Sequence, residues 1–177
     1  IEGLEENLRY RRSWVLGLHT HKWGLILDFA FGDRDFEQEW PPGSLIEGEA
    51  VYFPAALPQR LVFREGYRLA PFSKAPAEFP ALPELETFQK DWQNALAQNP
   101  WLTQLPVLLQ EVTPSFRQKK FSLSDCRGNQ LPLGGDPRLL WSLIALSGGR
   151  PLNLFGEFSG SALRPLSVPQ EDRLIFL

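Results

Sequence analysis

Both histidines of this chain of 177 residues lie in the stretch LGLHTHKWG, where they stand two residues apart. On a strand, His19 and His21 would project to the same side, where both could ligate a metal ion together with Asp28, Asp33 or Asp35. A structural zinc site needs four ligands, however, and the chain has one cysteine. The stretch also lies at the predicted turn between two strands, where polar residues are common and do not indicate a functional site. We therefore expect no bound metal, with His19, His21 and Asp28 as the ligand candidates.

Four carboxylates alternate along the stretch GDRDFEQE, at Asp33, Asp35, Glu37 and Glu39. Alternating carboxylates suit Ca²⁺ or Mg²⁺, but this run lacks the central glycine and the late bidentate glutamate of an EF-hand loop. The stretch is interpreted as a solvated acidic connection.

Common catalytic motifs are absent from the sequence: it has no G-x-S-x-G elbow, no P-loop, no G-x-G-x-x-G and no H-E-x-x-H. Cys126 lies in the turn-like stretch DCRG, far in the sequence from either histidine, and is predicted to be an ordinary exposed thiol. We expect no catalytic residue and a protein that is not an enzyme. A metal-dependent hydrolase centred on His19 and His21 is the alternative.

The stretch RYRRSW is the most suggestive binding feature. Arg9, Arg11, Arg12 and Trp14 could contact phosphates and stack on bases, and the same residue types are enriched in protein interfaces. Alternatively, these arginines simply pair with the glutamates of the preceding stretch IEGLEEN. Trp40, in the stretch EWPPG, is predicted to be exposed because prolines and a glycine surround it. These five residues are the candidates for partner binding.

Composition limits the classes of partner and compartment. The net charge is −3, whereas a nucleic-acid-binding domain usually carries a basic excess, so binding of nucleic acid would need a local patch. A single cysteine excludes an intramolecular disulfide and favours a reducing compartment, and no apolar stretch predicts a signal peptide or a membrane span. We expect a cytoplasmic protein without membrane contact. Because methionine is absent even at position 1, we expect the chain to be a piece of a longer protein.

The histidine stretch lies between two predicted strands, WVLGL and WGLILDFAFG. In the second, a large apolar residue occurs at every other position, which predicts a strand with one strongly buried face. The residues of that face are Trp23, Leu25, Leu27, Phe29 and Phe31. Two further strands are predicted in SLIEGEAVYFP and QRLVFREGYRLA, the latter with a turn at Glu65-Gly66.

Two helices are predicted, over 84–98 and 137–147. The first carries an apolar stripe at three- and four-residue spacing, with Pro83 at or near its first turn. The second has Asp136 as its cap and Gly148 at its end, and it is apolar on most sides, so we expect it deep in the core. Between the helices, PVLLQEV, SFRQKKFSLSD and NQLPL are each expected to be a strand. The tail is predicted to be a hairpin followed by one last strand.

These elements predict an α+β fold, mostly of antiparallel β hairpins or sheet with two main helices. Residues 1–69 would form a β-rich N-terminal part, residues 70–83 a strap rich in proline and alanine, and residues 84–177 a helix-hairpin-helix-hairpin part. Together they are expected to form one compact domain.

Three stretches carry a family resemblance: RRSWVLGLHTHKWGLILDFAFG, VYFPAALPQRLVF and LFGEFSGSALRPLSV. They resemble the region downstream of the zinc finger in bacterial SWIM zinc-finger proteins, and the resemblance runs from about Asn7 to Leu166. Genes of that family often lie beside those of a MoxR-type AAA+ ATPase and a von Willebrand factor A protein. The family's C-x-C…C-x-H ligands do not occur here, so the resemblance implies zinc only in a finger N-terminal to Ile1.

The expected function is therefore that of a non-catalytic protein-interaction or scaffold domain of a SWIM zinc-finger-type protein. By resemblance, its partner would be the AAA+ ATPase or the von Willebrand factor A protein. A nucleic-acid-binding module that uses Arg9, Arg11 and Arg12 is the first alternative, and the metal-dependent hydrolase at His19 and His21 is the second.

Overall fold

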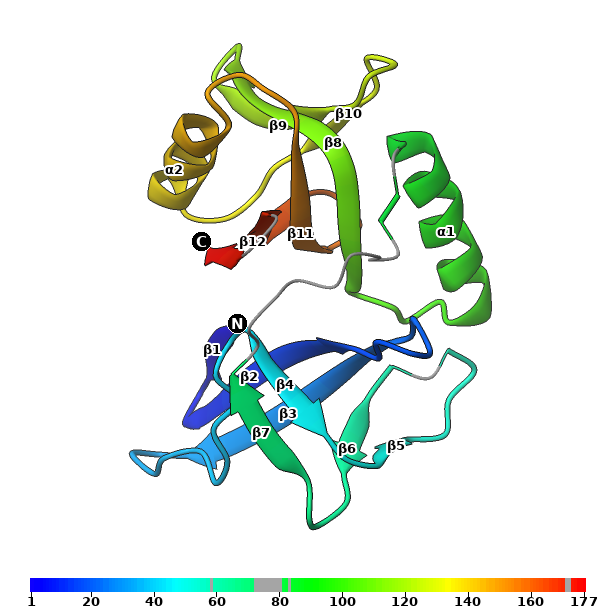
Figure 1. The fold of residues 1–177 in the computed structure, drawn as a ribbon, viewed down its shortest axis with the longest axis vertical. Coiled ribbons are helices and arrows are strands. Elements are labelled where there is room, and N and C mark those ends of the chain that lie inside the picture. Colours follow the sequence, from blue (N-terminus) through cyan, green and yellow to red (C-terminus); the bar gives the residue numbers. More distant parts are fainter. Residues whose placement is uncertain (58, 72–80, 83, 171–172) are drawn as a thin grey trace. The chain divides into compact units, whose positions relative to one another are not determined.

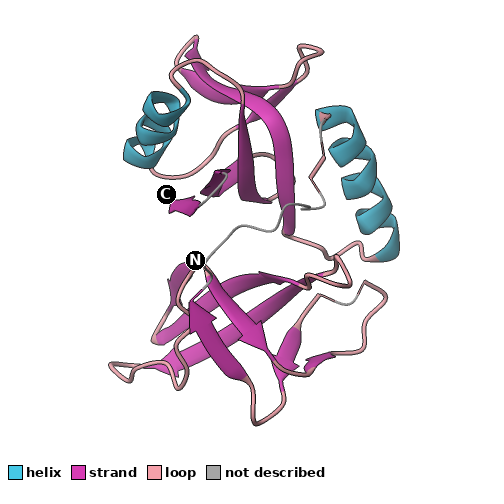
Figure 2. Ribbon diagram, viewed as in Figure 1, coloured by secondary structure: helices cyan, strands magenta, loops and turns pink. Residues whose placement is uncertain are grey.

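The structure, a computed structural model, describes residues 1–57, 59–71, 81–82, 84–170 and 173–177. The described residues form thirteen strands and two helices, with antiparallel pairing between the named strands, so the predicted α+β, mostly β fold is confirmed (Figures 1 and 2). The chain divides into two compact units, unit 1 (Ile1–Phe72) and unit 2 (Ser73–Leu177). Most of the predicted strap, including 72–80 and Pro83, lies outside the described residues.

Unit 1 is built of short antiparallel strands. They are β1 (Glu2–Glu5), β2 (Leu8–Leu16), β3 (Trp23–Phe31), β4 (Ser44–Glu47), β5 (Ala50–Tyr52), β6 (Leu61–Phe63) and β7 (Arg68–Pro71). The order β1-β2-β3 makes one sheet, and the pairs β4-β7 and β5-β6 make two more. Each of the two strands predicted over 44–54 and 59–70 is divided in the structure, into β4 and β5 and into β6 and β7. Gly48 marks the first break, where a Cβ atom would lie 2.7 Å from the Cβ of Tyr67, and the predicted turn at Glu65-Gly66 makes the second.

The sequence predicted the wrong buried face for β3. Its buried residues are Gly24, Ile26 and Ala30, whereas Phe29 and Phe31 are exposed, Phe31 by 65%. The cause is Leu61 of β6, which packs so closely that a Cβ on Gly24 would lie 2.1 Å from its Cδ2 atom. Small side chains allow β6 to approach that face, while on the other face Trp23, Leu25 and Leu27 are half-buried and Phe29 and Phe31 are exposed. Residue size at the contact, and not hydrophobicity alone, decided which face is buried.

Unit 2 holds a six-stranded sheet in the order β10-β9-β8-β11-β12-β13. Its strands are β8 (Leu105–Arg117), β9 (Lys120–Ser124), β10 (Gln130–Pro132), β11 (Leu152–Phe158), β12 (Leu163–Gln170) and β13 (Arg173–Phe176). The long strand β8 pairs with β11 along its first part and with β9 along its last, and the predicted C-terminal hairpin and last strand are confirmed as β11, β12 and β13. Just after β10, Leu133 bridges Leu163, which curls the sheet back on itself.

Both helices belong to unit 2, and both start and stop close to where the sequence predicts. Helix α1 spans Leu85–Gln98 and buries Leu85, Phe88 and Ala95. Helix α2 spans Pro137–Ser147, with the Asp136 side chain accepting a hydrogen bond from the backbone of Arg138 and with Gly148 in the left-handed conformation.

The prediction that α2 lies deep in the core is wrong. The helix buries Leu140, Leu143 and Ser147 on one side, but Trp141 is 50% exposed and Leu146 is exposed as well. A helix on the outside of a single sheet has one face to bury, so the apolar residues of α2 outside that buried face remain partly in contact with solvent.

The stretch predicted as one strand, SFRQKKFSLSD, contains a tight hairpin. Strand β8 ends at Arg117 and β9 begins at Lys120, and the two tip residues, Gln118 and Lys119, both have positive φ angles of 51° and 62°. The turn went unpredicted because it carries no glycine, asparagine or proline, the residues that ordinarily mark such turns.

No helix among the described residues has the length and apolar character needed to cross a membrane.

Candidate functional site

The structure does not bring the three metal-ligand candidates together. His19 and His21 are exposed in the loop between β2 and β3, where they were predicted, and His21 has a φ of 52°. Asp28 lies about 17 Å along β3 from Trp23, the first residue of that strand, at about 3.3 Å per residue. Its carboxylate accepts hydrogen bonds from Arg11. The described residues contain no group of three or more His, Cys, Asp or Glu side chains placed to hold a metal ion.

The five predicted partner-binding residues do not share one surface. Successive side chains of a strand point to opposite faces, so Arg9 and Arg11 lie on one face of β2, and Arg12 and Trp14 on the other. Trp40 lies outside the sheet, in the segment before β4.

Arg11 is a buried structural residue. Its side chain is only 10% exposed, and its guanidinium donates to Asp28 Oδ2 at 3.2 Å, to Glu39 Oε2 at 3.2 Å and to the backbone carbonyl of Gln38. The guanidinium carbon also lies 4.4 Å from the centre of the Phe36 ring. The acidic connection after β3 is therefore held against β2 by this arginine, which leaves Arg11 no free donor face for a phosphate.

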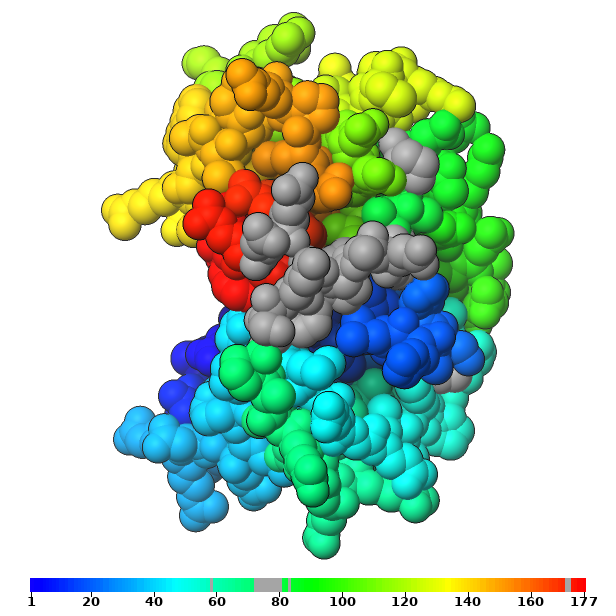
Figure 3. All heavy atoms as spheres, viewed as in Figure 1, coloured from blue at the N-terminus to red at the C-terminus, as the bar shows by residue number. Residues whose placement is uncertain are grey.

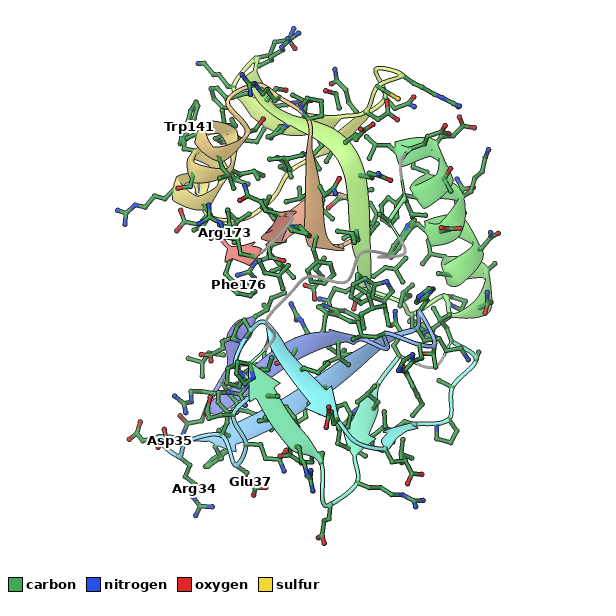
Figure 4. The ribbon with its side chains drawn as sticks, viewed as in Figure 1. Arg34, Asp35, Glu37, Trp141, Arg173 and Phe176 are labelled. Carbon is green, nitrogen blue, oxygen red and sulfur yellow. The ribbon has the colours of Figure 1, made fainter. Side chains whose placement is uncertain are left out.

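Arg9 supports the same loop. Its Nη2 donates to the backbone carbonyl of Arg34 at 2.6 Å, and its guanidinium lies 5.2 Å from the Phe36 ring centre. Figure 4 shows Arg34, Asp35 and Glu37 projecting outward from this loop. The arginine pairing considered from the sequence is observed for Arg9 and Arg11, and the partners described here come from β3 and the loop after it.

Trp40 is half-buried, so the prediction that it is exposed is wrong. Its ring centre lies 5.3 Å from that of Tyr67 and 5.9 Å from that of Phe63. The turn after it, closed by the backbone bond from Ser44 to the carbonyl of Pro41, turns the chain back into β4. Trp40 therefore belongs to a small aromatic core of unit 1.

Asp125 looks like a functional carboxylate, but it is a structural cap. It is 7% exposed and accepts hydrogen bonds from the backbone of Leu85, Arg127 and Asn129 and from the Asn129 side chain. Burial opposes its ionisation, yet the hydrogen bonds from Asn129, Leu85 and Arg127 outweigh burial and lower the pKa of Asp125. It caps α1 from outside the helix, while Cys126 beside it is a free, exposed thiol as predicted.

An aromatic cluster on the surface of unit 2 was not predicted. It consists of Phe116 of β8, Phe121 of β9 and Trp141 of α2, whose ring centres lie 4.5 to 5.2 Å apart. Trp141 is 50% exposed and Phe116 is 40% exposed, and Phe121 connects them to the core. Three rings from three elements thus pack against one another at the surface, and Figure 4 shows where Trp141 lies on α2.

Four basic residues lie on the hairpin and the helix that carry this aromatic cluster. Arg117, Lys119 and Lys120 form the tip of the β8–β9 hairpin, and Arg138 lies one turn before Trp141 on α2; all four are exposed. Figure 3 shows the yellow-green hairpin tip standing out from unit 2 above the gold and orange residues of α2 and the turn that follows it. Because successive side chains of a strand point to opposite faces, Arg117 and Lys120 project from the face of the hairpin opposite to Phe116 and Phe121.

The spacing of the two phenylalanines did not predict the aromatic cluster, because the turn between them was not predicted. Phe116 and Phe121 stand five residues apart, an odd separation that would put them on opposite faces of a continuous strand. A two-residue turn between them makes them cross-strand partners on one face, as observed.

Comparisons of the chain with protein-family models, with curated proteins and with solved structures give no match. The resemblance to SWIM zinc-finger proteins therefore stays a prediction.

Proposed function

We propose that this chain is a non-catalytic protein-interaction domain and that the aromatic cluster is part of its interaction surface. The observation that carries the proposal is the half-exposed Trp141, which packs against Phe116 and Phe121 on the outer side of a helix whose opposite side is already buried.

Surface energetics favour such a role. Single exposed apolar residues are common on soluble proteins, but three aromatic rings grouped around an exposed tryptophan expose a contiguous apolar area. Tryptophan is enriched among the residues that contribute most to protein interfaces, and its two side-chain torsions lose little entropy on binding. Fixing Trp141 between two phenylalanines lowers that entropy cost further.

The resemblance stated above adds a candidate for the partner. It supports the proposal that the domain works in the cytoplasm beside a MoxR-type AAA+ ATPase or a von Willebrand factor A protein. Zinc would then be a property of a finger outside this chain, and none of the residues described above is proposed to hold it.

Affinity capture tests the function. The purified, tagged chain would be incubated with cell lysate with and without nuclease, and retained proteins would be identified by mass spectrometry and then rebound as purified components. We expect a protein that is retained after nuclease treatment and that binds the chain directly. If all partners are lost with nuclease, or if no protein binds the chain in purified form, the proposed function is wrong.

A further inference from the structure

Strand β3 pairs with β2 along one edge, and its other edge is open over the second half of the strand. In an antiparallel pair, residues alternate between those whose backbone groups bond the partner strand and those whose groups point away from it. Just past the end of β3, Gly32 donates to the carbonyl of Asn7, and this bond fixes the alternation in the continuous β2–β3 register. The backbone groups of Leu27, Phe29 and Phe31 therefore point away from β2.

These outward backbone groups are almost all unpaired within the described part of the chain. At the start of the strand, Leu25 donates to the carbonyl of Gln59 at 2.7 Å, which occupies the edge there. Further along, the N–H groups of Leu27, Phe29 and Phe31 and the carbonyls of Leu27 and Phe29 bond no other group of the described residues. A row of unpaired backbone groups of this kind is what one strand offers to another. We call residues 27–31 the free edge of β3.

The side chains along the free edge favour pairing. Phe29 is 47% exposed and Phe31 is 65% exposed, and both project from the same face of the strand. The one charged residue of this stretch, Asp28, is neutralised by Arg11 at 3.2 Å. Proteins usually protect an open edge with unpaired charges, prolines or bulges, and the opposite edge of this sheet, β1, carries an exposed glutamate at each end. The free edge of β3 has no such protection.

We propose that the free edge of β3 pairs, antiparallel, with the same edge of a second copy of this chain. The two-fold axis passes beside Phe29, so that the two Phe29 residues exchange both of their backbone hydrogen bonds, while Leu27 of each copy pairs with Phe31 of the other. All three free N–H groups of each copy then have an acceptor. The carbonyl of Phe31 also accepts from the backbone of Arg34 at 3.4 Å, and a carbonyl oxygen has two lone pairs. This inference goes beyond the proposed function and uses none of the residues of the aromatic cluster.

A second copy fits this edge in length and in charge. The open stretch is bounded at one end by Gln59, which occupies the edge at Leu25, and at the other by Gly32, whose φ of 62° turns the chain out of the strand. Two copies centred on the middle residue of this stretch therefore cover one another without running into either boundary. On the opposite face of the strands, Asp28 of each copy stands across from Ala30 of the other, so no like charges oppose each other.

The symmetry of this contact limits the size and the strength of the assembly. Each copy uses the same edge once, so the interface is closed and the assembly stops at a dimer. A contact between two short strands is smaller than the interfaces of stable dimers, so we expect a dissociation constant of about 10–500 μM. At the low micromolar concentrations of an unfolding experiment the chain is then monomeric.

Sedimentation equilibrium of the full chain, from about 5 μM to 1 mM, tests the proposal. Position 29 meets itself across the axis, so Phe29→Lys places two ammonium groups there and Phe29→Glu places two carboxylates. Each variant alone should dimerise at least tenfold more weakly than the unaltered chain, whereas an equimolar mixture of the two should recover a dimer, because opposite charges then meet. Val62→Lys is the matched control, since Val62 is 46% exposed on β6 and should tolerate a lysine without loss of the dimer. Circular dichroism would check that each variant is folded.

Amide hydrogen exchange, measured by NMR at low and at high concentration, tests the strand pairing itself. Exchange at Leu27, Phe29 and Phe31 should slow when the dimer forms, because their N–H groups become hydrogen-bonded, while exchange at Asp28 and Ala30, already bonded to β2, should change less.

Several outcomes would overturn the proposal. A chain that stays monomeric at 1 mM, a mixture that dimerises no better than either charged variant alone, assembly beyond a dimer, or unchanged exchange at Phe29 would each do so. If the chain stays monomeric but a purified partner protein binds it and loses affinity for Phe29→Lys, the edge takes a strand of another protein instead. If the chain stays monomeric and binds such a partner regardless of Phe29, this inference fails while the proposed function stands.

Discussion

A charged residue's role depends on what the fold brings to it, and Arg11 is the clearest case. In the sequence it stands among other arginines and aromatics and resembles part of a binding patch. In the structure Asp28, Glu39 and Phe36 surround it, and all three come from β3 and the loop after it. No spacing rule links positions 11, 36 and 39, so the sequence could not show that the arginine is an internal clamp.

Arg11→Ala should destabilise unit 1. The substitution leaves the carboxylate of Asp28, whose side chain is 20% exposed, without its cation, and breaking a pair of this kind costs about 2–4 kcal/mol. Chemical denaturation would measure the loss, with Arg34→Ala as the control because the Arg34 side chain is exposed. A loss below about 0.5 kcal/mol, the range of ordinary surface substitutions, would contradict the clamp.

Asp125 supports a prediction about pH. Because its folded pKa is lowered, the ionised carboxylate stabilises the protein at pH values above its unfolded pKa of about 3.9, and the contribution is lost as pH falls through the lower folded pKa. At pH 7, Asp125→Asn should cost about 2–4 kcal/mol through the lost charge-assisted hydrogen bonds.

Urea unfolding at pH 7, 4 and 3 would measure the free energy of unfolding of Asp125→Asn and of the unaltered protein. We expect the difference between the two values to become smaller as the pH is lowered. Asp35→Asn, in the exposed loop after β3, is the control and should have the same free energy of unfolding as the unaltered protein at pH 7. A difference that stays constant with pH would mean that the charge of Asp125 is not what stabilises α1.

At the scale of elements, local sequence features determine where the helices begin and end, whereas contacts between elements determine which face of a strand or helix is buried. Both helix predictions are confirmed because caps and apolar stripes are short-range features, such as Asp136 before Pro137 and Gly148 after Ser147. The faces of β3 and of α2 depend instead on which elements pack against them. Period-two and helical patterns show that a face is apolar, but they do not show whether another element covers it.

Substitutions on the two faces of β3 should differ strongly in how much they destabilise the protein. Ile26→Ala, at a buried position, should destabilise the protein by about 2–4 kcal/mol through the cavity it leaves. Phe31→Thr, at a position 65% exposed, should change stability by less than about 0.5 kcal/mol. Thermal and urea unfolding of both variants would check this. A larger loss of stability for Phe31→Thr than for Ile26→Ala would instead support the buried face predicted from the sequence.

At the scale of the whole molecule, the hydrophobic core is divided unequally between the two units. The main cluster of buried apolar residues, from Leu85 to Val168, and the half-buried residues packed on it all belong to unit 2. Unit 1 buries far fewer apolar residues, among them Ile26, Ala30 and Leu61, and places a charged arginine among them. A unit of this size with so little apolar burial is close to the limit of independent stability.

We therefore predict that Ser73–Leu177 folds alone and that Ile1–Phe72 alone is markedly less stable. The isolated C-terminal piece should melt cooperatively and reproduce the amide chemical shifts that the same residues show in the full chain. The isolated N-terminal piece should melt at a lower temperature or remain unfolded, because unit 1 buries few apolar residues. If that piece instead fails to melt cooperatively, the stability of unit 2 depends on residues 1–72, and the apparent independence of its core is misleading.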